Sequence, residues 1–264
     1  MKSFEGKTVL ITGASSGIGK VFAQKLAASK ARLLLTARRE DQLQKLAAEL
    51  SQQHGVETHC FKADLSRADA PWQIHEWTRS KNFQVDLLIN NAGFGSYGRF
   101  DEMPINELQA MMQVNIQALV LLSRLFIPEI KLRKGGMIQI ASTAAFQPVP
   151  YLALYAATKA FVKSFSKALW AENRDVRIFC LCPGNTESEF HDTAGIHQKK
   201  VFFRATSDDL VQFGLSKFLN SNAPVGVHGV INSILAFSNR FAPSRLALAI
   251  TRKIYEVRTE QKQG

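Results

Sequence analysis

Short apolar runs alternate along the chain with longer helical patterns, and this alternation constrains the fold more than any other feature. Residues typical of strands occupy 8–11, 32–36, 57–62, 85–90, 136–141 and 176–181. Helical periodicity marks 18–29, 40–54, 104–131 and 152–172. Several strand runs are apolar on both faces, as in a parallel sheet covered by helices. The alternation therefore predicts a doubly wound parallel sheet in a three-layer α/β/α sandwich, with ligands bound beyond the carboxyl ends of the strands.

The length of 264 residues fits one large α/β domain. The strict alternation ends near residue 191. We therefore expect a single domain over 1–264, with a substrate lid at 191–206, then a helix and a short strand, and a basic C-terminal helix and tail at 243–264. No run approaches the roughly 20 apolar residues of a membrane span. The N-terminus enters a strand with no room for a signal peptide. Three cysteines in apolar runs indicate reduced thiols, and we expect a cytoplasmic protein.

The net charge of +11 is high. It is compatible with a polyanionic partner, an anionic membrane, phosphorylated ligands or simply a solvated basic surface. The chain lacks a helix-turn-helix, zinc or aromatic RNA-binding motif, so no nucleic-acid partner is expected. Cys180 and Cys182 would share one strand face, but no second ligand pair accompanies them, and no metal site is predicted.

The first strand leads directly into a glycine-rich turn that opens a helix. Glycines there permit a tight turn, let the backbone approach a pyrophosphate and let the helix pack close to the strand. The helix N-terminus then presents free N–H groups and its positive dipole end to the phosphates. This pattern predicts a Rossmann-type dinucleotide site formed by Gly13, Ser15, Ser16, Gly17, Ile18 and Gly19.

The end of the second strand bears on the choice of dinucleotide. An NAD site would place an acid there for the ribose 2′-hydroxyl, whereas this strand ends in alanine followed by Arg38 and Arg39. Arginine forks suit a 2′-phosphate, so NADP(H) is predicted over NAD(H). The alternative is that both arginines are solvated residues at a helix start.

The third and fourth strands end in residues suited to the rest of a dinucleotide. Asp64 and Leu65 follow the third strand, where they could meet the adenine. Asn91, Ala92 and Gly93 follow the fourth, where small residues let backbone lie against the cofactor.

Tyr155 and Lys159 lie four residues apart in the expected helix over 152–172. Side chains at this spacing stack on one helix face. An ammonium held beside a phenol favours the phenolate and lowers the tyrosine pKa, which suits a general acid at neutral pH. The same pair would also occur on an ordinary solvated helix face.

Together these motifs resemble those of the classical short-chain dehydrogenase/reductase family over residues 7–190. The resemblance rests on Gly13, Gly17 and Gly19, on Asp64, on the Asn-Asn-Ala-Gly segment at 90–93, and on a tetrad at Asn115, Ser142, Tyr155 and Lys159. It implies that Tyr155 protonates the substrate carbonyl oxygen and that Ser142 hydrogen-bonds it. It also implies that Lys159 lowers the tyrosine pKa and bonds the nicotinamide ribose, while Asn115 holds a water of a proton relay.

The resemblance implies further cofactor contacts after the sixth strand, from Pro183, Gly184, Thr186 and Ser188. Here the chain departs from the family pattern, because Thr186 stands at a commonly apolar position and Ser188 replaces a threonine. The C-terminal region also lacks the family's frequent Asp-Gly-Gly ending. It is more similar to a subgroup with ketoacyl- and hydroxysteroid-reductase-like members. A homodimer or homotetramer is implied.

Aromatic and aliphatic residues surround the expected substrate position. They suggest a lipophilic carbonyl substrate such as an acyl, steroid-like, terpenoid or aromatic ketone. The alternative is that they only pack the core. The candidates are Phe94, Phe146, Pro148 and Tyr151 on one wall and Phe190 and Phe202 in the lid.

The expected C-terminal helix carries an apolar stripe beside basic residues. The stripe comprises Leu246, Ile250, Ile254 and Val257. It could dock on an anionic membrane surface, but packing on its own domain or on a partner subunit is favoured. For the whole chain, the leading hypothesis is an NADP(H)-dependent oxidoreductase. The alternative is a catalytically silent NADPH-binding sensor or scaffold.

Overall fold

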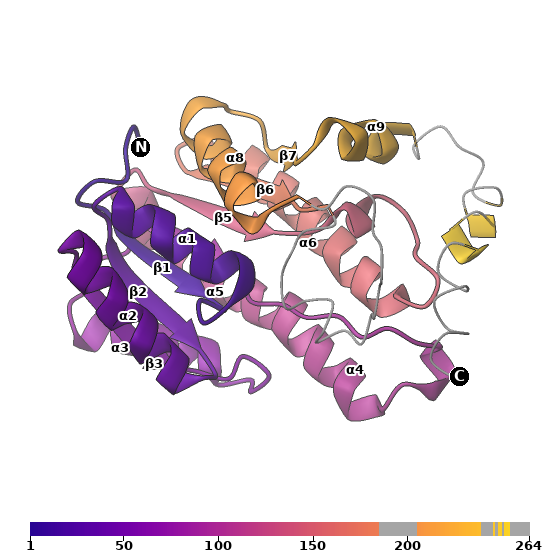
Figure 1. Cartoon of the computed structure of the whole chain (residues 1–264), viewed down its shortest axis with the longest axis horizontal. Helices are drawn as coiled ribbons and strands as arrows, with labels where there is room; N and C mark the ends of the chain where they lie inside the picture. The colour runs from indigo at the N-terminus through magenta and orange to yellow at the C-terminus, as the bar shows by residue number, and fades with distance from the viewer. Residues whose placement is uncertain (185–204, 239–244, 246–247, 250, 254–264) are drawn as a thin grey trace.

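A computed structural model describes residues 1–184, 205–238, 245, 248–249 and 251–253 of the chain. Parallel strands form one sheet in the order β3-β2-β1-β4-β5-β6-β7 (Figure 1). The strands are β1 (Thr8–Thr12), β2 (Arg32–Ala37), β3 (Thr58–Lys62), β4 (Leu87–Asn90), β5 (Gly136–Ile140), β6 (Arg177–Cys182) and β7 (Val225–Val227). The order reverses between β1 and β4, and such a switch point opens a crevice at the carboxyl ends of the strands.

Helices cover both faces of this sheet, which confirms the predicted three-layer, single-domain α/β/α sandwich. One face carries α1 (Gly17–Ala28), α2 (Glu40–His54) and α8 (Ser207–Asn220), whose apolar residues share a core cluster. The other face carries α3 (Ala70–Ser80), α5 (Leu119–Leu132) and α6 (Ala153–Glu172). Strand residues supply the two cores alternately: Val9 and Ile11 face the first, and Leu10 faces the second. This alternation explains why the strand runs are apolar throughout.

The helix expected over 104–131 is not uniform. It consists of α4 (Ile105–Met112), a π-helical segment (Gln113–Ala118) and α5. By length and composition alone, the run Ile105–Leu132 could cross a membrane. In this fold, however, Leu122, Phe126 and Ile130 of that run are buried against the sheet. It is therefore a core helix whose middle turn is widened at Asn115, and π-turns are frequent at functional sites.

Two helices are absent from the sequence-based expectations. One is α3, although its buried residues Ala70, Ile74 and Thr78 recur at helical spacing. The other is α9 (Val230–Ser238), which follows β7. The expected short strand after residue 206 is present as β7. Most of the expected lid and C-terminal helix lies outside the described residues, although 245, 248–249 and 251–253 are helical.

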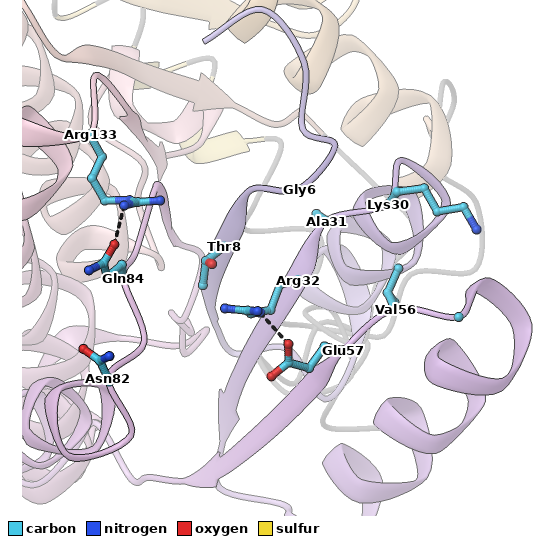
Figure 2. Close-up of a pocket in the computed structure, with 11 residues that line it drawn as sticks. Gly6, Thr8, Lys30, Ala31, Arg32, Val56, Glu57, Asn82, Gln84 and Arg133 are labelled. Carbon is cyan, nitrogen blue, oxygen red and sulfur yellow. Dashed lines mark hydrogen bonds and ion pairs between the residues drawn. The ribbon is translucent and has the colours of Figure 1, made fainter.

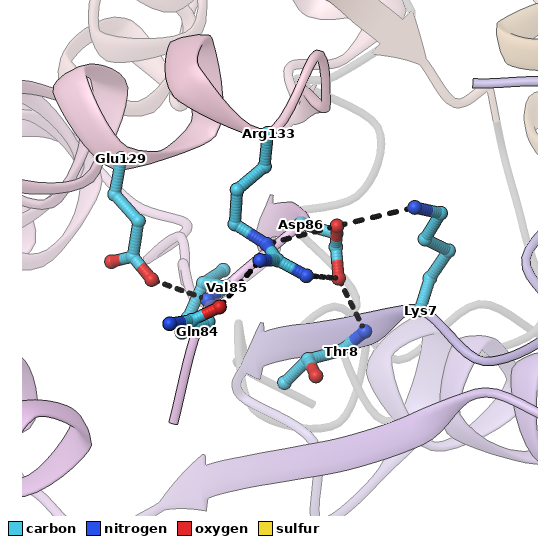
Figure 3. Close-up of polar contacts among 7 residues, drawn as sticks. All are labelled: Lys7, Thr8, Gln84, Val85, Asp86, Glu129 and Arg133. Carbon is cyan, nitrogen blue, oxygen red and sulfur yellow. Dashed lines mark hydrogen bonds and ion pairs between the residues drawn. The ribbon is translucent and has the colours of Figure 1, made fainter. Parts of the chain in front are cut away.

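The amino ends of the strands form a densely paired edge. Asp86 is buried, and its carboxylate accepts from Arg133 Nε and Nη2 at 3.0 and 3.1 Å and from the Thr8 N–H at 2.9 Å (Figure 3). Lys7 Nζ approaches the same carboxylate at 3.4 Å. Beside it, Glu129 accepts from the Val85 N–H at 2.7 Å, and burial raises the pKa of the Glu129 carboxyl. These contacts tie β1, β4 and the end of α5 together.

A polar groove of about 550 Å³ crosses this amino edge (Figure 2). Arg32 pairs with Glu57 at 2.7 Å on one side, and Arg133 donates to Gln84 on the other. Helices α1, α2 and α3 end beside the groove, in left-handed residues Lys30, Gly55 and Asn82. The groove therefore lies among helix C-termini, and its cations complement their negative dipole ends.

Candidate active site

At three positions of the glycine turn after β1, the backbone conformation or the lack of space disfavours a side chain. Gly13 and Gly17 have φ of 64° and 52°, the left-handed region that favours glycine. A Cβ on Gly19 would lie 2.2 Å from the Gly13 carbonyl oxygen and 2.5 Å from Asn91 Nδ2. The first turn of α1 is thus pressed against the end of β1, with bare backbone facing the crevice.

The N-terminus of α1 is not capped by a side chain. Ser16 occupies the N-cap position without a capping hydrogen bond, and no acidic residue stands in the first turn. The hydroxyls of Ser15 and Ser16 instead accept from Arg39, with Nη2 at 3.3 and 2.6 Å. The N–H groups and the positive dipole end of α1 therefore remain available to an anion, with a guanidinium beside them.

Two side chains fasten the glycine turn to the end of β4. Thr12 Oγ1 accepts from the N–H groups of Asn91 and Ala92, each at 3.0 Å. Asn91 Nδ2 donates to the carbonyls of Thr12 and Gly13 at 2.9 and 3.1 Å. Thr12 was not among the sequence candidates, although it stands within the glycine motif.

At the carboxyl end of β3, Asp64 is fixed by its own turn. Its Oδ1 accepts from the N–H and the hydroxyl of Ser66 at 3.0 and 2.8 Å. Leu65 is buried with Ala63 in the core cluster of α3 and α5. Both residues lie at the same sheet edge as the glycine turn, next to β2.

Asn115 links three segments of the site. Its Oδ1 accepts from the Phe94 N–H at 3.0 Å, and its Nδ2 donates to the Phe94 carbonyl and to Thr158 Oγ1 at 2.9 and 3.0 Å. Thr158 in turn donates to the Tyr155 carbonyl at 2.8 Å. Asn115 therefore holds the loop after β4 against α6. Thr158 was missed from the sequence, although it stands between the tyrosine and the lysine.

Lys159 brings an isolated cation into this buried region. The residue is 5 % exposed, and its Nζ donates to the Ile140 carbonyl at 2.9 Å. The same Nζ lies 5.8 Å from the centroid of the Tyr155 ring, and a Cβ on Gly93 would lie 3.0 Å from it. No carboxylate pairs with it in the described part of the chain. Burial lowers the pKa of the Lys159 ammonium to about 8.

Ser142 stands at the end of β5 as the N-cap of a short 3-10 turn (Thr143–Phe146), and its Oγ accepts from the Ala144 N–H at 3.1 Å. The hydroxyl proton stays available for donation. The Thr143 N–H binds the Pro183 carbonyl at 2.7 Å, which joins this turn to the segment after β6.

The family of the chain follows from its similarity to known proteins. A profile of the family described as short chain dehydrogenase matches residues 7–199. The chain belongs to the short-chain dehydrogenase family.

Individual relatives lie within the same family. The chain is 33 % identical over 186 residues to an 11-beta-hydroxysteroid dehydrogenase A of Sesamum indicum, covering 70 % of this chain and 53 % of that protein. It thus spans about half the length of that curated relative.

Solved structures align along most of the chain. A short-chain dehydrogenase from Sphingobium yanoikuyae in complex with NADPH is 30 % identical, with a TM-score of 0.81 over 89 % of this chain and 93 % of that one. A 3-ketoacyl-(acyl-carrier-protein) reductase from Brucella melitensis, complexed with NADH, is 27 % identical, with a TM-score of 0.74 over 86 % and 98 %. Solved relatives therefore bind either dinucleotide.

The glycine cradle of this short-chain dehydrogenase fits a dinucleotide. A β-carbon at Gly19 or Gly93 would collide with or crowd polar atoms of the site, so the backbone there is bare. The uncapped α1 terminus supplies donors for phosphate oxygens. Arg38 and Arg39 are both exposed, and Arg39 lies beside this terminus, where it donates to Ser16. Ile18 packs partly buried against the core below the turn.

The residues predicted to contact the substrate of this short-chain dehydrogenase do not all lie in one cluster. Phe94 and Tyr151 pack with the buried cluster that contains Tyr155. Phe146 packs in a different cluster, where Lys163 Nζ lies 3.8 Å from its ring centroid. Pro148 is exposed. Pro183 and Gly184 follow β6 at the site, while four candidates lie outside the described residues: Thr186, Ser188, Phe190 and Phe202.

The two strand cysteines lie beneath the site. Cys180 and Cys182 are buried free thiols with their sulfurs 4.0 Å apart, as expected for one strand face. Hydrogen bonding to Cys182 lowers the pKa of the Cys180 thiol. In the described part of the chain, no group of three or more metal-ligating side chains occurs.

Proposed function

We propose that this protein is an NADP(H)-dependent oxidoreductase that interconverts a lipophilic carbonyl compound and its secondary alcohol. The observation that carries the proposal is the buried Lys159 on the same helix as Tyr155, beside a bare glycine cradle and with no carboxylate paired to it in the described part of the chain. A lone ammonium in a dry site is a costly arrangement, and such perturbed groups concentrate at functional sites.

The dinucleotide would be held at the carboxyl edge and would supply the hydride. Backbone at Gly13–Gly19 would bind its phosphates, Asp64 and Leu65 its adenine, and residues 91–93 its central part. Lys159, Pro183 and Gly184 would border the nicotinamide ribose and ring. Arg39 favours NADP(H), because a guanidinium already bonded to Ser16 beside the phosphate cradle can also pair with a 2′-phosphate.

The proton chemistry falls to α6 and the turn after β5. Tyr155 donates its phenolic proton to the carbonyl oxygen during reduction, and Ser142 donates a hydrogen bond to the same oxygen. The Lys159 ammonium stabilises the phenolate that forms, which lowers the pKa of the tyrosine. Asn115 fixes the loop that carries Gly93 and Phe94 against α6, and we propose that it also lies on the proton's path to solvent.

The substrate class follows from the apolar surroundings of Tyr155. Its cluster contains Tyr97, Met111, Val149 and Leu152, with Phe94 and Tyr151 packed against it. A small number of polar groups in an apolar wall suits a lipophilic ketone. The relatives named above act, by their names, on hydroxysteroids and on ketoacyl chains, and both classes fit this wall.

NADPH oxidation across a carbonyl panel tests the proposal. The panel spans 3-oxoacyl thioesters, steroid and terpenoid ketones, and aromatic ketones and aldehydes. We expect turnover of at least one class, and Tyr155→Phe should lower kcat by about 100-fold to 10,000-fold while NADPH binding is retained. Tight NADPH binding without turnover on any substrate would instead favour a catalytically silent sensor, and absence of NADPH binding would refute the proposal.

Cofactor preference is tested by Arg39→Ala and, separately, by Arg38→Ala. Loss of one charge-assisted contact should weaken NADPH binding by about tenfold and leave NADH binding nearly unchanged. The NADH measurement on the same variant controls for damage to the glycine turn. Equal losses for both dinucleotides would refute the role of the arginine in selecting the 2′-phosphate.

A further inference from the structure

Helix α9 presents an exposed aliphatic face. Val230, Ile231, Ile234 and Leu235 are 77 %, 51 %, 62 % and 56 % exposed. The spacing i, i+1, i+4 and i+5 places all four on one side of the helix. Other exposed large hydrophobic residues in the described part of the chain are scattered over other elements. A clustered apolar face of this kind marks an interaction surface, whereas isolated exposed residues need no explanation.

The opposite face of α9 fixes the helix to the fold. Asn232 packs on Gly184 so closely that a Cβ on this glycine would lie 2.2 Å from Asn232 Nδ2, which donates to the His228 carbonyl at 2.9 Å. Ser233 Oγ donates to the Gly229 carbonyl at 2.9 Å, and Ala236 is buried. Figure 1 shows α9 at the periphery beyond β7. The aliphatic face therefore points away from the sheet, beside its carboxyl edge.

The sequence on both sides of α9 contains basic residues and no acidic residue. Residues 210–255 contain no Asp or Glu but contain Lys217, Arg240, Arg245, Arg252 and Lys253. Of these, Lys217, Arg245, Arg252 and Lys253 are described and exposed. An exposed apolar face, followed in the sequence by exposed cations, supplies the two attractions that hold an interfacial helix on an anionic bilayer, namely burial of aliphatic side chains and pairing with headgroups.

We propose that the aliphatic face of α9 docks on an anionic phospholipid surface. A second copy of the chain fits this face less well. A helix of nine residues is about 13.5 Å long. It cannot by itself supply the roughly 800 Å² per partner of a stable interface. Two copies would also bring like charges together, whereas the basic stretch complements anionic headgroups.

Because α9 contacts Gly184, which follows the carboxyl end of β6, docking in this orientation would place the carboxyl edge of the sheet close to the bilayer. A lipophilic substrate could then enter from the membrane, a consequence that rests on the proposed function. The docking itself does not depend on that function, and it is measured without turnover.

Vesicle co-sedimentation of the full chain tests the proposal. One set of vesicles contains phosphatidylcholine alone, and the other contains phosphatidylcholine with phosphatidylglycerol. We expect binding to the anionic vesicles that added salt weakens. The double variant Ile231→Ser and Ile234→Ser should bind about tenfold more weakly, since each aliphatic side chain contributes burial. Leu132→Ser is the matched control, because it also replaces an exposed aliphatic side chain, 85 % exposed, but at the amino edge of the sheet. This variant should bind the vesicles as the wild-type chain does.

Arg245→Gln with Lys253→Gln provides a second test that leaves the apolar face intact. It should weaken binding to anionic vesicles and leave the thermal transition unchanged. Failure of the wild-type chain to bind anionic vesicles would overturn the proposal, as would equal binding by the Ile231/Ile234 variant. A concentration-dependent dimer that the Ile231/Ile234 variant abolishes would assign the face to a second copy and would likewise overturn it.

Discussion

The two edges of the sheet differ in how their charged groups are paired. At the amino edge, the carboxylate of Asp86 is paired with Arg133 and Lys7 and also accepts a backbone N–H. At the carboxyl edge, Lys159 is buried with no carboxylate paired to it among the described residues, and the N-terminus of α1 has no side-chain cap. The amino edge is saturated and stabilises the fold, whereas the carboxyl edge keeps cationic and N–H donors available for a ligand. Buried cations without a carboxylate partner and uncapped helix N-termini are typical of ligand-binding sites, which favours the carboxyl edge as the functional end of the sheet.

Two glycine substitutions, one at each edge of the sheet, should show the largest difference between the edges. Gly19→Ala forces a methyl group to within 2.2 Å of a carbonyl oxygen, so we expect about 3 kcal/mol of strain and roughly 100-fold weaker NADPH binding. Gly55→Ala at the amino edge meets nothing within 4 Å and should cost about 1 kcal/mol of stability for its left-handed backbone. Calorimetric titration with NADPH and thermal unfolding measure both. Equal loss of NADPH binding in the two variants would contradict the assignment of the cradle.

Removal of the buried carboxylate tests the structural role of the amino edge. Asp86→Ala leaves Arg133 and Lys7 without their shared partner and the Thr8 N–H without its acceptor. We expect about 3 kcal/mol lower free energy of unfolding, with unchanged NADPH affinity of the folded protein. Chemical denaturation measures the first quantity. Asp86→Asn, which keeps an acceptor for Thr8, should lose less, and a larger loss would argue against this account.

The lone lysine predicts a specific pH dependence of stability. The pKa of Lys159 falls from its ordinary value of 10.5 to about 8 on folding. Between these values the unfolded chain binds a proton that the folded protein does not, so stability rises with pH across this window. Relative to Lys159→Met, the wild-type chain should gain up to about 3 kcal/mol between pH 8 and 10.5. A flat difference in unfolding free energy across this range would show that the ammonium is not desolvated.

An exposed ion pair at the amino edge should show the smallest effect. Arg32 and Glu57 are about half exposed, in contrast to Asp86. Hydrogen bonding to His59 lowers the pKa of Glu57, but solvent screens this pair. Glu57→Gln should therefore change the free energy of unfolding by under about 1 kcal/mol. A loss comparable to that of Asp86→Ala would mean that the whole edge, and not the buried carboxylate, stabilises the sheet.

Sequence patterns alone predict the sheet, its helical layers and the position of the glycine turn. These features are readable because they depend on periodicity and on spacing within a few residues. The same locality made the Tyr155 and Lys159 pair visible, since one helix holds both. The same kind of pattern is present in α3, where Ala70, Ile74 and Thr78 recur at helical spacing, although the sequence-based expectations did not include this helix. Local pattern was insufficient for the π-helical turn around Asn115, which coincides with contacts to distant Phe94 and Thr158.

The hydrogen-bond and ion-pair partners of the charged and polar groups, by contrast, follow from packing in three dimensions. Asp86 meets Thr8 and Arg133 across 78 and 47 residues of sequence, and Thr12 meets Asn91 across 79. The burial of Lys159, the contact of Arg39 with Ser16 and the outward aliphatic face of α9 are likewise products of packing. Burial and charge pairing depend on what surrounds a side chain in space, and a one-dimensional pattern records only what precedes and follows it.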